Sequence, residues 1–236
     1  MKNNMKNLIK KIKETKISYW FLGITAYYFV GAFMQNLLSV KTLGNSAMAI
    51  VTAGTLISWS VFGAIDIITE VWGKKVAIRT FWTSAILNLI FTGICWIAIL
   101  IPGTNDFVGS AYAVILGTGW RIAICSMLAF ILSNYTNTLI MHVMKSKSKN
   151  KKDGKEFSLR LVLSTLAGQI IDNALFFTLA FAPFGIAGTI EMSWIFILEV
   201  VAFTTTIEVI VEGAFSPLFH KFTLYLESKK NLEGDK

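Results

Sequence analysis

Six carboxylates of this chain stand inside long apolar stretches, where an ionised side chain is hard to accommodate. A charge at the centre of a membrane helix costs about 2.5–3.5 kcal/mol even on the most lenient insertion scale. We therefore expect these groups to face the interior of a helix bundle, a wet cavity or an interface, and to mark a substrate or ion path. The six residues are Asp66, Glu70, Asp172, Glu199, Glu208 and Glu212.

Helical spacing divides these carboxylates into groups. Asp66 and Glu70 are four residues apart and share a helix face, and the same holds for Glu208 and Glu212. Glu199 precedes Glu208 by nine residues, about half a turn around the helix, so it points elsewhere. We expect Glu199, Glu208 and Glu212 to balance charge or to take part in energy coupling.

Asp172 belongs to a polar stripe near the middle of its apolar stretch. Gln169 lies one turn before it, Asn173 is adjacent, and Phe176 follows one turn later. One helix therefore offers a carboxylate, an amide and an aromatic face. Trp59 lies away from the ends of another predicted membrane span. Its ring either packs against neighbouring side chains or offers a second aromatic face for stacking on a ligand.

The remaining polar residues indicate no metal, cofactor or enzyme chemistry. His142 and His220 have no second ligand at metal spacing, and two cysteines cannot form a thiolate cluster. The sequence lacks a phosphate loop, a nucleophile elbow and a His-Glu zinc pattern. Arg121 follows Gly117-Thr118-Gly119, and it either reaches the outer interface or pairs with a carboxylate.

Composition identifies the elements that must position these residues. Of 236 residues, 54% are apolar and 15% charged, and the mean hydropathy is +0.60. A soluble domain has about 45–50% apolar and about 25% charged residues, so a water-soluble globule is excluded. No stretch alternates with period two, so we predict an all-α integral membrane bundle. Its six spans are expected at Ser18–Val40, Ser46–Glu70, Ile78–Ile101, Gly119–Met144, Ser158–Phe181 and Met192–Phe219.

The basic residues predict the orientation of this bundle. The net charge is +8, and 20 of the 22 Lys and Arg residues fall in segments that six crossings would place on one side. The positive-inside rule then puts both termini in the cytoplasm of a multi-pass plasma-membrane protein. We expect a basic arm at 1–17, a transmembrane domain at 18–219 and a tail at 220–236. We interpret the lysine-rich loop at residues 145–155 as a solvated loop, and we expect no nucleic-acid binding there.

Two segments have less definite expectations. The basic arm is either a short helix on anionic lipid heads or a frayed tail. Residues 110–117 are apolar but too short to cross a membrane, so they are expected to be interfacial or re-entrant.

Three polar blocks occur in a definite order along the chain. The first is Asp66, Glu70, Gly73, Lys74 and Lys75, the second is Arg121, Ser126 and Ala129, and the third is Arg160, Ser164, Thr165, Gln169 and Asp172. Together they resemble the motifs of the queuosine precursor transporter (vitamin uptake transporter) family. Trp72 stands where that family usually has Tyr, and Asn137 stands where many members carry Asp.

This resemblance implies a small-molecule importer, with no cofactor, for 7-deazaguanine bases that serve tRNA modification. The base would be the 7-cyano form, the 7-aminomethyl form or queuine. Roles within the binding site follow as expectations. Gln169, Asp172 and Asn173 contact the base, Asp66 or Glu70 supplies a second anion, and Phe176 or Trp59 stacks on the ring. Arg121, which is counted among the substrate-binding residues, and Arg160 either balance charge or latch the two ends of the site.

Several alternatives remain open at this level. The chain is either a transporter by itself or the substrate-binding subunit of an energy-coupling-factor transporter, which needs ATPase partners. Import is either driven by protons or facilitated. The substrate preference and the oligomeric state, including a homo-oligomer, are also open. The middle spans of the two halves both carry Ile-Asp, which suggests an inverted three-plus-three repeat.

Overall fold

The computed structural model describes residues 18–39, 41–43, 51–103, 105–116, 120–148, 150, 152–183 and 193–234. For residues 42, 43, 51, 120–123 and 231–234 it describes the backbone alone. The basic arm at 1–17 lies outside the described residues, so both expectations for it stay predictions. The elements are α2 (Tyr19–Leu38), β1 (Thr42–Leu43), β2 (Val51–Thr52), α3 (Thr55–Trp72), α4 (Lys74–Leu100), α5 (Asp106–Leu116), α6 (Trp120–Lys147), α7 (Gly154–Phe181) and α8 (Trp194–Gly234).

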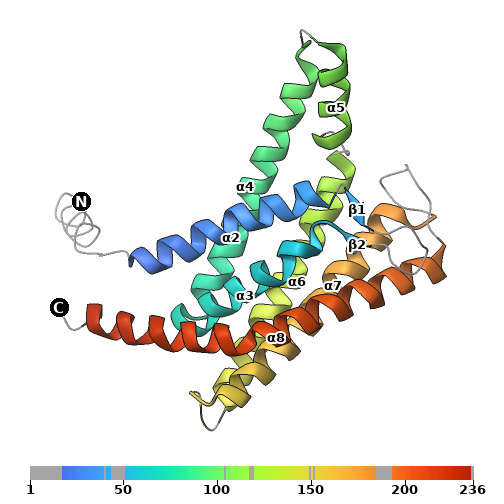
Figure 1. Cartoon of the computed structure of the whole chain (residues 1–236). Coiled ribbons are helices and arrows are strands. Elements are labelled where there is room, and N and C mark those ends of the chain that lie inside the picture. The colour runs from blue at the N-terminus through green and yellow to red at the C-terminus, as the bar shows by residue number, and fades with distance from the viewer. Residues whose placement is uncertain are drawn as a thin grey trace, which may run out of the picture.

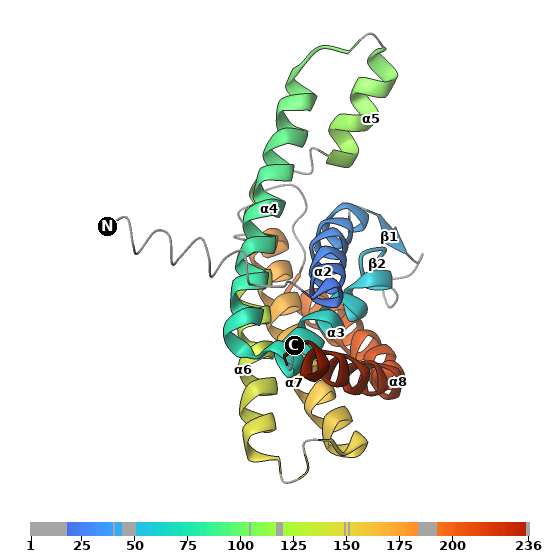
Figure 2. The same cartoon turned by 90° about the vertical axis from the view of Figure 1, so that its left-hand side faces the viewer.

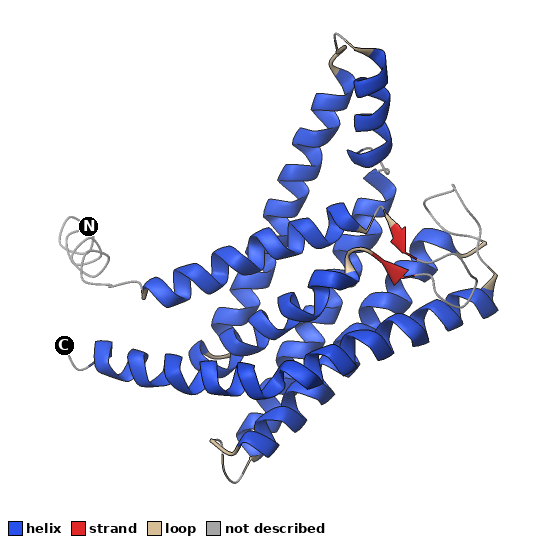
Figure 3. Ribbon diagram, viewed as in Figure 1, coloured by secondary structure: helices blue, strands red, loops and turns tan. Residues whose placement is uncertain are grey.

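The predicted helical membrane bundle is confirmed in the described part of the chain. Six of its helices are long and apolar enough to cross a membrane, namely every helix except α5. Figure 3 shows that the fold is helical apart from one small hairpin. Helix α5 has 11 residues and spans about 16 Å, so it is too short to cross. None of its residues is buried.

The second membrane helix starts later than the sequence predicts. Helix α3 begins at Thr55 instead of Ser46. The preceding residues include the antiparallel strands β1 and β2, in which Thr42 pairs with Thr52. The amide of Ala53 extends this pairing by donating to the Lys41 carbonyl, at 2.7 Å. Strand pairing satisfies backbone groups before the helix begins.

The last membrane helix also differs from its predicted boundary. Helix α8 continues beyond Phe219 to Gly234 and contains Pro217. The residues that follow Phe219 are therefore helical as far as Gly234. The division of the chain at 219 into membrane domain and tail stays a prediction.

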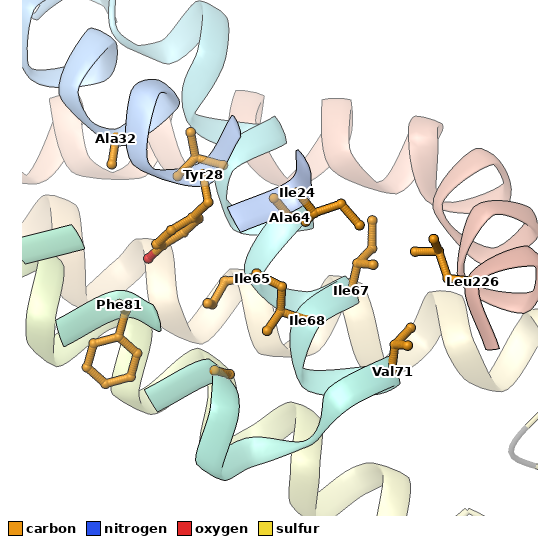
Figure 4. Packing of buried hydrophobic residues seen from close by; sticks show 12 residues of the cluster. Ile24, Tyr28, Ala32, Ala64, Ile65, Ile67, Ile68, Val71, Phe81 and Leu226 are labelled. Atoms are coloured by element: carbon orange, nitrogen blue, oxygen red, sulfur yellow. The ribbon is translucent and has the colours of Figure 1, made fainter. Parts of the chain in front are cut away.

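Helix α3 is the central helix of the described bundle. Of its most apolar 18-residue window, 72% is buried, against 11% for α4. Figure 4 shows its isoleucines packed between the neighbouring helices. The labelled residues are Ala64, Ile65, Ile67, Ile68 and Val71 of α3, with Ile24, Tyr28, Ala32, Phe81 and Leu226 around them.

The connections of the bundle lie on two sides. In Figure 1 the α3–α4 turn, the α6–α7 loop and the end of α8 lie toward the lower left, and β1–β2 and the α4–α5 connection lie toward the top and right. The far half of α4 and all of α5 extend beyond the other helices (Figure 2). Their exposed apolar side chains suit a lipid environment.

Candidate substrate site

Polar side chains of four helices meet in the apolar interior of the bundle. All of them are buried except Asp172, which is half-buried. They come from α3, α6, α7 and α8, so only the tertiary fold brings them together. We call this set the central polar cluster; it consists of Ser58, Asp66, Ser133, Asn137, Ser164, Thr165, Gln169, Asp172, Asn173, Thr205, Glu208 and Glu212.

Asp66 links three of the helices. Its carboxylate accepts from the Asn137 amide nitrogen at 2.7 Å and from the Ser164 hydroxyl at 3.3 Å. Asn137 is the position at which the resemblance leads us to expect Asp in many proteins of that kind. As an amide it donates to Asp66, which a second carboxylate could not do without a proton.

Glu208 is held by the opposite part of the cluster. It accepts from the Ser58 hydroxyl and, at 3.2 Å, from the amide nitrogen of Asn173. The same amide lies 3.1 Å from the Thr205 hydroxyl oxygen. Glu208 therefore has hydrogen-bond donors on both of its oxygens.

Close packing of α7 against α6 makes this arrangement possible. A Cβ atom added to Gly168 would lie 3.1 Å from the Asn137 Cβ and 3.1 Å from a ring carbon of Phe62. Small residues allow membrane helices to approach closely. Gly168 is adjacent to Gln169 in the sequence. The close contact at Gly168 therefore also determines how near the polar side chains of α7 lie to α3 and α6.

Glu70 lies at the C-terminal end of α3 in a different electrostatic environment. Arg160 donates to its carboxylate at 3.0 Å, and both side chains are 2% exposed. Lys145 lies 3.3 Å from the same oxygen and 3.8 Å from Glu227 of α8. Two opposite charges close to one carboxylate compensate the cost of its burial.

Lysines also reach the last carbonyl groups of α3. Lys145 donates to the Glu70 carbonyl at 2.5 Å, and Lys230 of α8 donates to the Val71 carbonyl at 2.6 Å. Cations stabilise the C-terminal end of a helix through its free carbonyls and its dipole. We call Glu70, Lys145, Arg160, Glu227 and Lys230 the α3-end network.

A cavity of about 420 Å³ opens beside the α3-end network. Glu70 is one of its lining residues and is also four residues from Asp66 of the central polar cluster. The Glu70–Arg160 pair therefore stands between this cavity and the cluster.

The aromatic candidates have different surroundings. Trp59 is stacked on Phe215, with ring centroids 4.5 Å apart and an interplanar angle of 25°. Phe176 is half-buried one turn beyond Asp172, and it meets Phe177 edge-on at 5.3 Å. Asp172 itself accepts from the Ser133 hydroxyl at 3.1 Å.

Two more predicted site residues, Glu199 and Arg121, belong neither to the cluster nor to the α3-end network. Glu199 is exposed near the start of α8, away from Glu208 and Glu212 as its spacing predicts. Glu199 lies five residues from the start of α8, close to one end of the bundle. Arg121 lies in α6, but its side chain is outside the described part of the structure.

Sequence reasoning missed several contact residues of the cluster. Thr205 stands in a run of three threonines and Ser58 is two positions from Ser60, so the sequence does not show which hydroxyl faces the cluster. Lys145 opens a lysine-rich loop and could not be distinguished from its neighbours.

Comparison with known proteins accounts for this arrangement at the level of a family. Residues 52–221 match a family described as "Putative vitamin uptake transporter". The chain belongs to this family. The matched region contains the whole central polar cluster, and the resemblance read from the three motif blocks is confirmed. As a member of the vitamin uptake transporter family, the chain is a multi-pass membrane transporter of small molecules and not an enzyme.

A named relative is similar over most of both chains. Over 162 residues the chain is 27% identical to the "Probable queuosine precursor transporter" of Bacillus subtilis (strain 168). This match covers 68% of the present chain and 69% of the relative. No solved structure matches the chain.

Proposed function

We propose that this transporter imports queuosine precursors across the plasma membrane, for salvage into tRNA modification. The substrate would be a 7-deazaguanine base in its 7-cyano or 7-aminomethyl form, or queuine. The observation that carries the proposal is the central polar cluster, a buried set of carboxylates and amides inside a transporter whose relative bears that name.

The chemistry of the cluster suits such a base. A guanine-type ring presents two N–H donors on its Watson–Crick edge, and one carboxylate accepts from both with good geometry. An amide donates to the ring carbonyl. An aminomethyl substituent is cationic and calls for a second carboxylate. The cluster supplies all of these groups within one buried region.

The contacts narrow the expected roles. We assign the base to the face of α7 that carries Gln169 and Asp172, with Asp172 nearest the 7-substituent because a single hydroxyl contacts its carboxylate. Phe176 is assigned to stacking, since Trp59 already stacks on Phe215. Glu70 is held by Arg160 and Lys145, which favours a role in opening the path to the cavity over direct binding.

Uptake in cells tests the proposal directly. A bacterial strain that lacks both precursor synthesis and its own importer is supplied with 7-cyano-7-deazaguanine, and queuosine in its tRNA is measured by mass spectrometry. Expression of this chain is expected to restore queuosine, and Asp172→Asn and Gln169→Ala are expected to reduce uptake strongly. Absence of queuosine with a well-expressed wild-type chain would refute the proposal.

Reconstitution distinguishes the importer from the alternative, a subunit that depends on ATPases. Uptake into proteoliposomes that contain this chain alone would exclude an energy-coupling-factor transporter. Co-purification with a transmembrane coupling protein and two ATPases would favour it. Comparing uptake with and without a pH gradient separates proton-driven import from facilitated diffusion.

A further inference from the structure

Three side chains of the central polar cluster, Thr165, Gln169 and Glu212, have no hydrogen-bond partner within the described residues. Of these, Gln169 and Glu212 each carry two such atoms. Gln169 and Glu212 are both 0% exposed. Neither the amide oxygen and nitrogen of Gln169 nor the two carboxylate oxygens of Glu212 have a hydrogen-bond partner within the described residues. A buried polar group without a partner costs about 1–3 kcal/mol, and a charged group costs more. Such a pair is expected where a ligand completes the hydrogen bonds.

The other carboxylates of the cluster already have donors. Asp66 accepts from Asn137 and Ser164, and Glu208 accepts from Ser58 and Asn173. Asp172 accepts from a serine and is only half-buried. Among the carboxylates that the structure describes in this cluster, Glu212 is the one with neither oxygen in a hydrogen bond, and the Thr165 hydroxyl, also without a hydrogen bond, is the donor beside it.

The register of α7 and α8 places Gln169 and Glu212 within about one helical turn of each other. These helices are antiparallel, since Ser158 meets Ser216 at 2.8 Å and Asn173 meets Thr205 at 3.1 Å. Asn173 also contacts Glu208. One turn earlier on α7 than Asn173 is Gln169, and one turn later on α8 than Glu208 is Glu212. Gln169 and Glu212 therefore both lie on the α7–α8 interface, within about one helical turn of each other.

The charge around Glu212 favours a ligand that donates hydrogen bonds. Asp66 and Glu208 are the charged groups that interact electrostatically with Glu212, and both are acidic. No lysine or arginine contacts Glu212 in the part of the chain that the structure describes. A ring that presents N–H groups to Glu212 would relieve this negative potential, whereas a ring that presents lone pairs would be repelled.

We propose that Glu212 and Gln169 together read the Watson–Crick edge of the imported base. The Glu212 carboxylate accepts from the ring N1–H and from the exocyclic 2-amino group, and the Gln169 amide nitrogen donates to the adjacent ring carbonyl. This inference rests on the proposed function and deepens it, because it makes the 2-amino group the feature by which guanine-type rings are selected.

A pair of ligands that differ only in that amino group tests the assignment. Binding of 7-cyano-7-deazaguanine and of its 2-desamino analogue to the full chain in detergent is measured by calorimetry. The wild-type protein is expected to favour the guanine-type ligand by about 10- to 100-fold. Glu212→Gln is expected to lose this preference, with little change for the desamino analogue. Its amide presents only one acceptor where two are needed.

Gln169→Leu gives a complementary result under the same model. This substitution is expected to lower the affinity for both ligands by a similar factor of about 5- to 30-fold, because both ligands carry the ring carbonyl that Gln169 is proposed to contact. The preference for the 2-amino group stays intact. Thr206→Val, on the exposed face of α8, is the matched control and leaves both affinities unchanged.

The outcomes separate this inference from the function on which it rests. A wild-type protein that binds neither ligand overturns both. A wild-type protein that binds, with a monodisperse Glu212→Gln variant that keeps the full preference, overturns the assignment alone. If Glu212→Gln does not fold, Glu212→Asp decides the question. A reduced preference supports the assignment and an unchanged one refutes it.

Discussion

Glu70 and Glu212 are both buried carboxylates, but their surroundings make them chemically different. Glu70 has Arg160 at 3.0 Å and Lys145 at 3.3 Å, whereas the oxygens of Glu212 accept no hydrogen bond from the described residues. A buried ion pair satisfies its own charges and resists change. An unpartnered carboxylate is free to meet a ligand. At the scale of single residues, this contrast favours Glu212 over Glu70 for the recognition role proposed above.

The first prediction concerns the Glu70–Arg160 pair. Arg160→Ala is expected to destabilise the protein by about 3 kcal/mol, at the low end for a broken buried pair because Lys145 still neutralises part of the charge on Glu70. Thermal unfolding in detergent measures the loss. Adding Glu70→Gln is expected to recover much of it, because no buried charge is then left alone. A double variant as unstable as Arg160→Ala would contradict this account.

At the scale of elements, glycine positions determine how closely helices approach. Gly168 brings α7 against Asn137 and Phe62, whereas no atom lies within 4 Å of the Cβ position of Gly93 on α4. Glycine therefore has different effects at these two sites. Gly168 allows two helices to pack closely, whereas Gly93 only lowers the stability of the α4 helix.

The second prediction follows from this contrast. Gly168→Ala is expected to cost about 1–3 kcal/mol, because its Cβ would press on Asn137 and Phe62. It is also expected to reduce uptake, since a shift of α7 displaces Gln169. Gly93→Ala is the control and is expected to stabilise the protein by up to about 1 kcal/mol. Equal effects in thermal unfolding would show that the α6–α7 contact is less tight than described.

The third prediction concerns the turn between α3 and α4. Gly73 has φ of 90° and ψ of 162°, a conformation that residues with a Cβ rarely adopt. Its amide donates to the carbonyls of Ile68 and Thr69 and so ends α3. Gly73→Ala is therefore expected to lower the unfolding free energy by about 1–3 kcal/mol. An unchanged unfolding temperature would mean that the turn adopts another conformation.

At the scale of the whole molecule, the orientation of the bundle determines which of its two ends faces the cytoplasm. The α3–α4 turn, the α6–α7 loop and the end of α8 gather on one side of the bundle (Figure 1). These segments carry most of the lysines outside the N-terminal arm. We infer from the positive-inside rule that this side is cytoplasmic. The cavity beside the α3-end network would then be the exit toward the cytoplasm.

The fourth prediction tests this orientation. In a variant without Cys95 and Cys125, single cysteines replace Asn105 near α5, Lys152 in the α6–α7 loop, or Lys229 near the end of α8. A membrane-impermeant maleimide added to intact cells is expected to label the cysteine at 105. The other two are expected to react only after permeabilisation. The reverse pattern would show that both termini lie outside.

Local features of the sequence determined the class of the molecule. Six runs of apolar residues determine six membrane helices, because a run of about 20 such residues matches the thickness of a bilayer. Helical spacing also determines that Asp66 and Glu70 share one face and that Glu208 and Glu212 share another. The later start of α3 escaped prediction, because strand pairing between distant residues competes with apolar content.

The partners of each polar group were decided only by the tertiary structure. Asp66 meets Asn137, 71 positions away, and Glu70 meets Arg160, 90 positions away. Helix spacing says which side chains share a face, but the packing of α3, α6, α7 and α8 determines what that face meets. For the same reason the sequence treats Glu208 and Glu212 alike. Only the fold gives donors to the first and leaves the second without a partner in the described bundle.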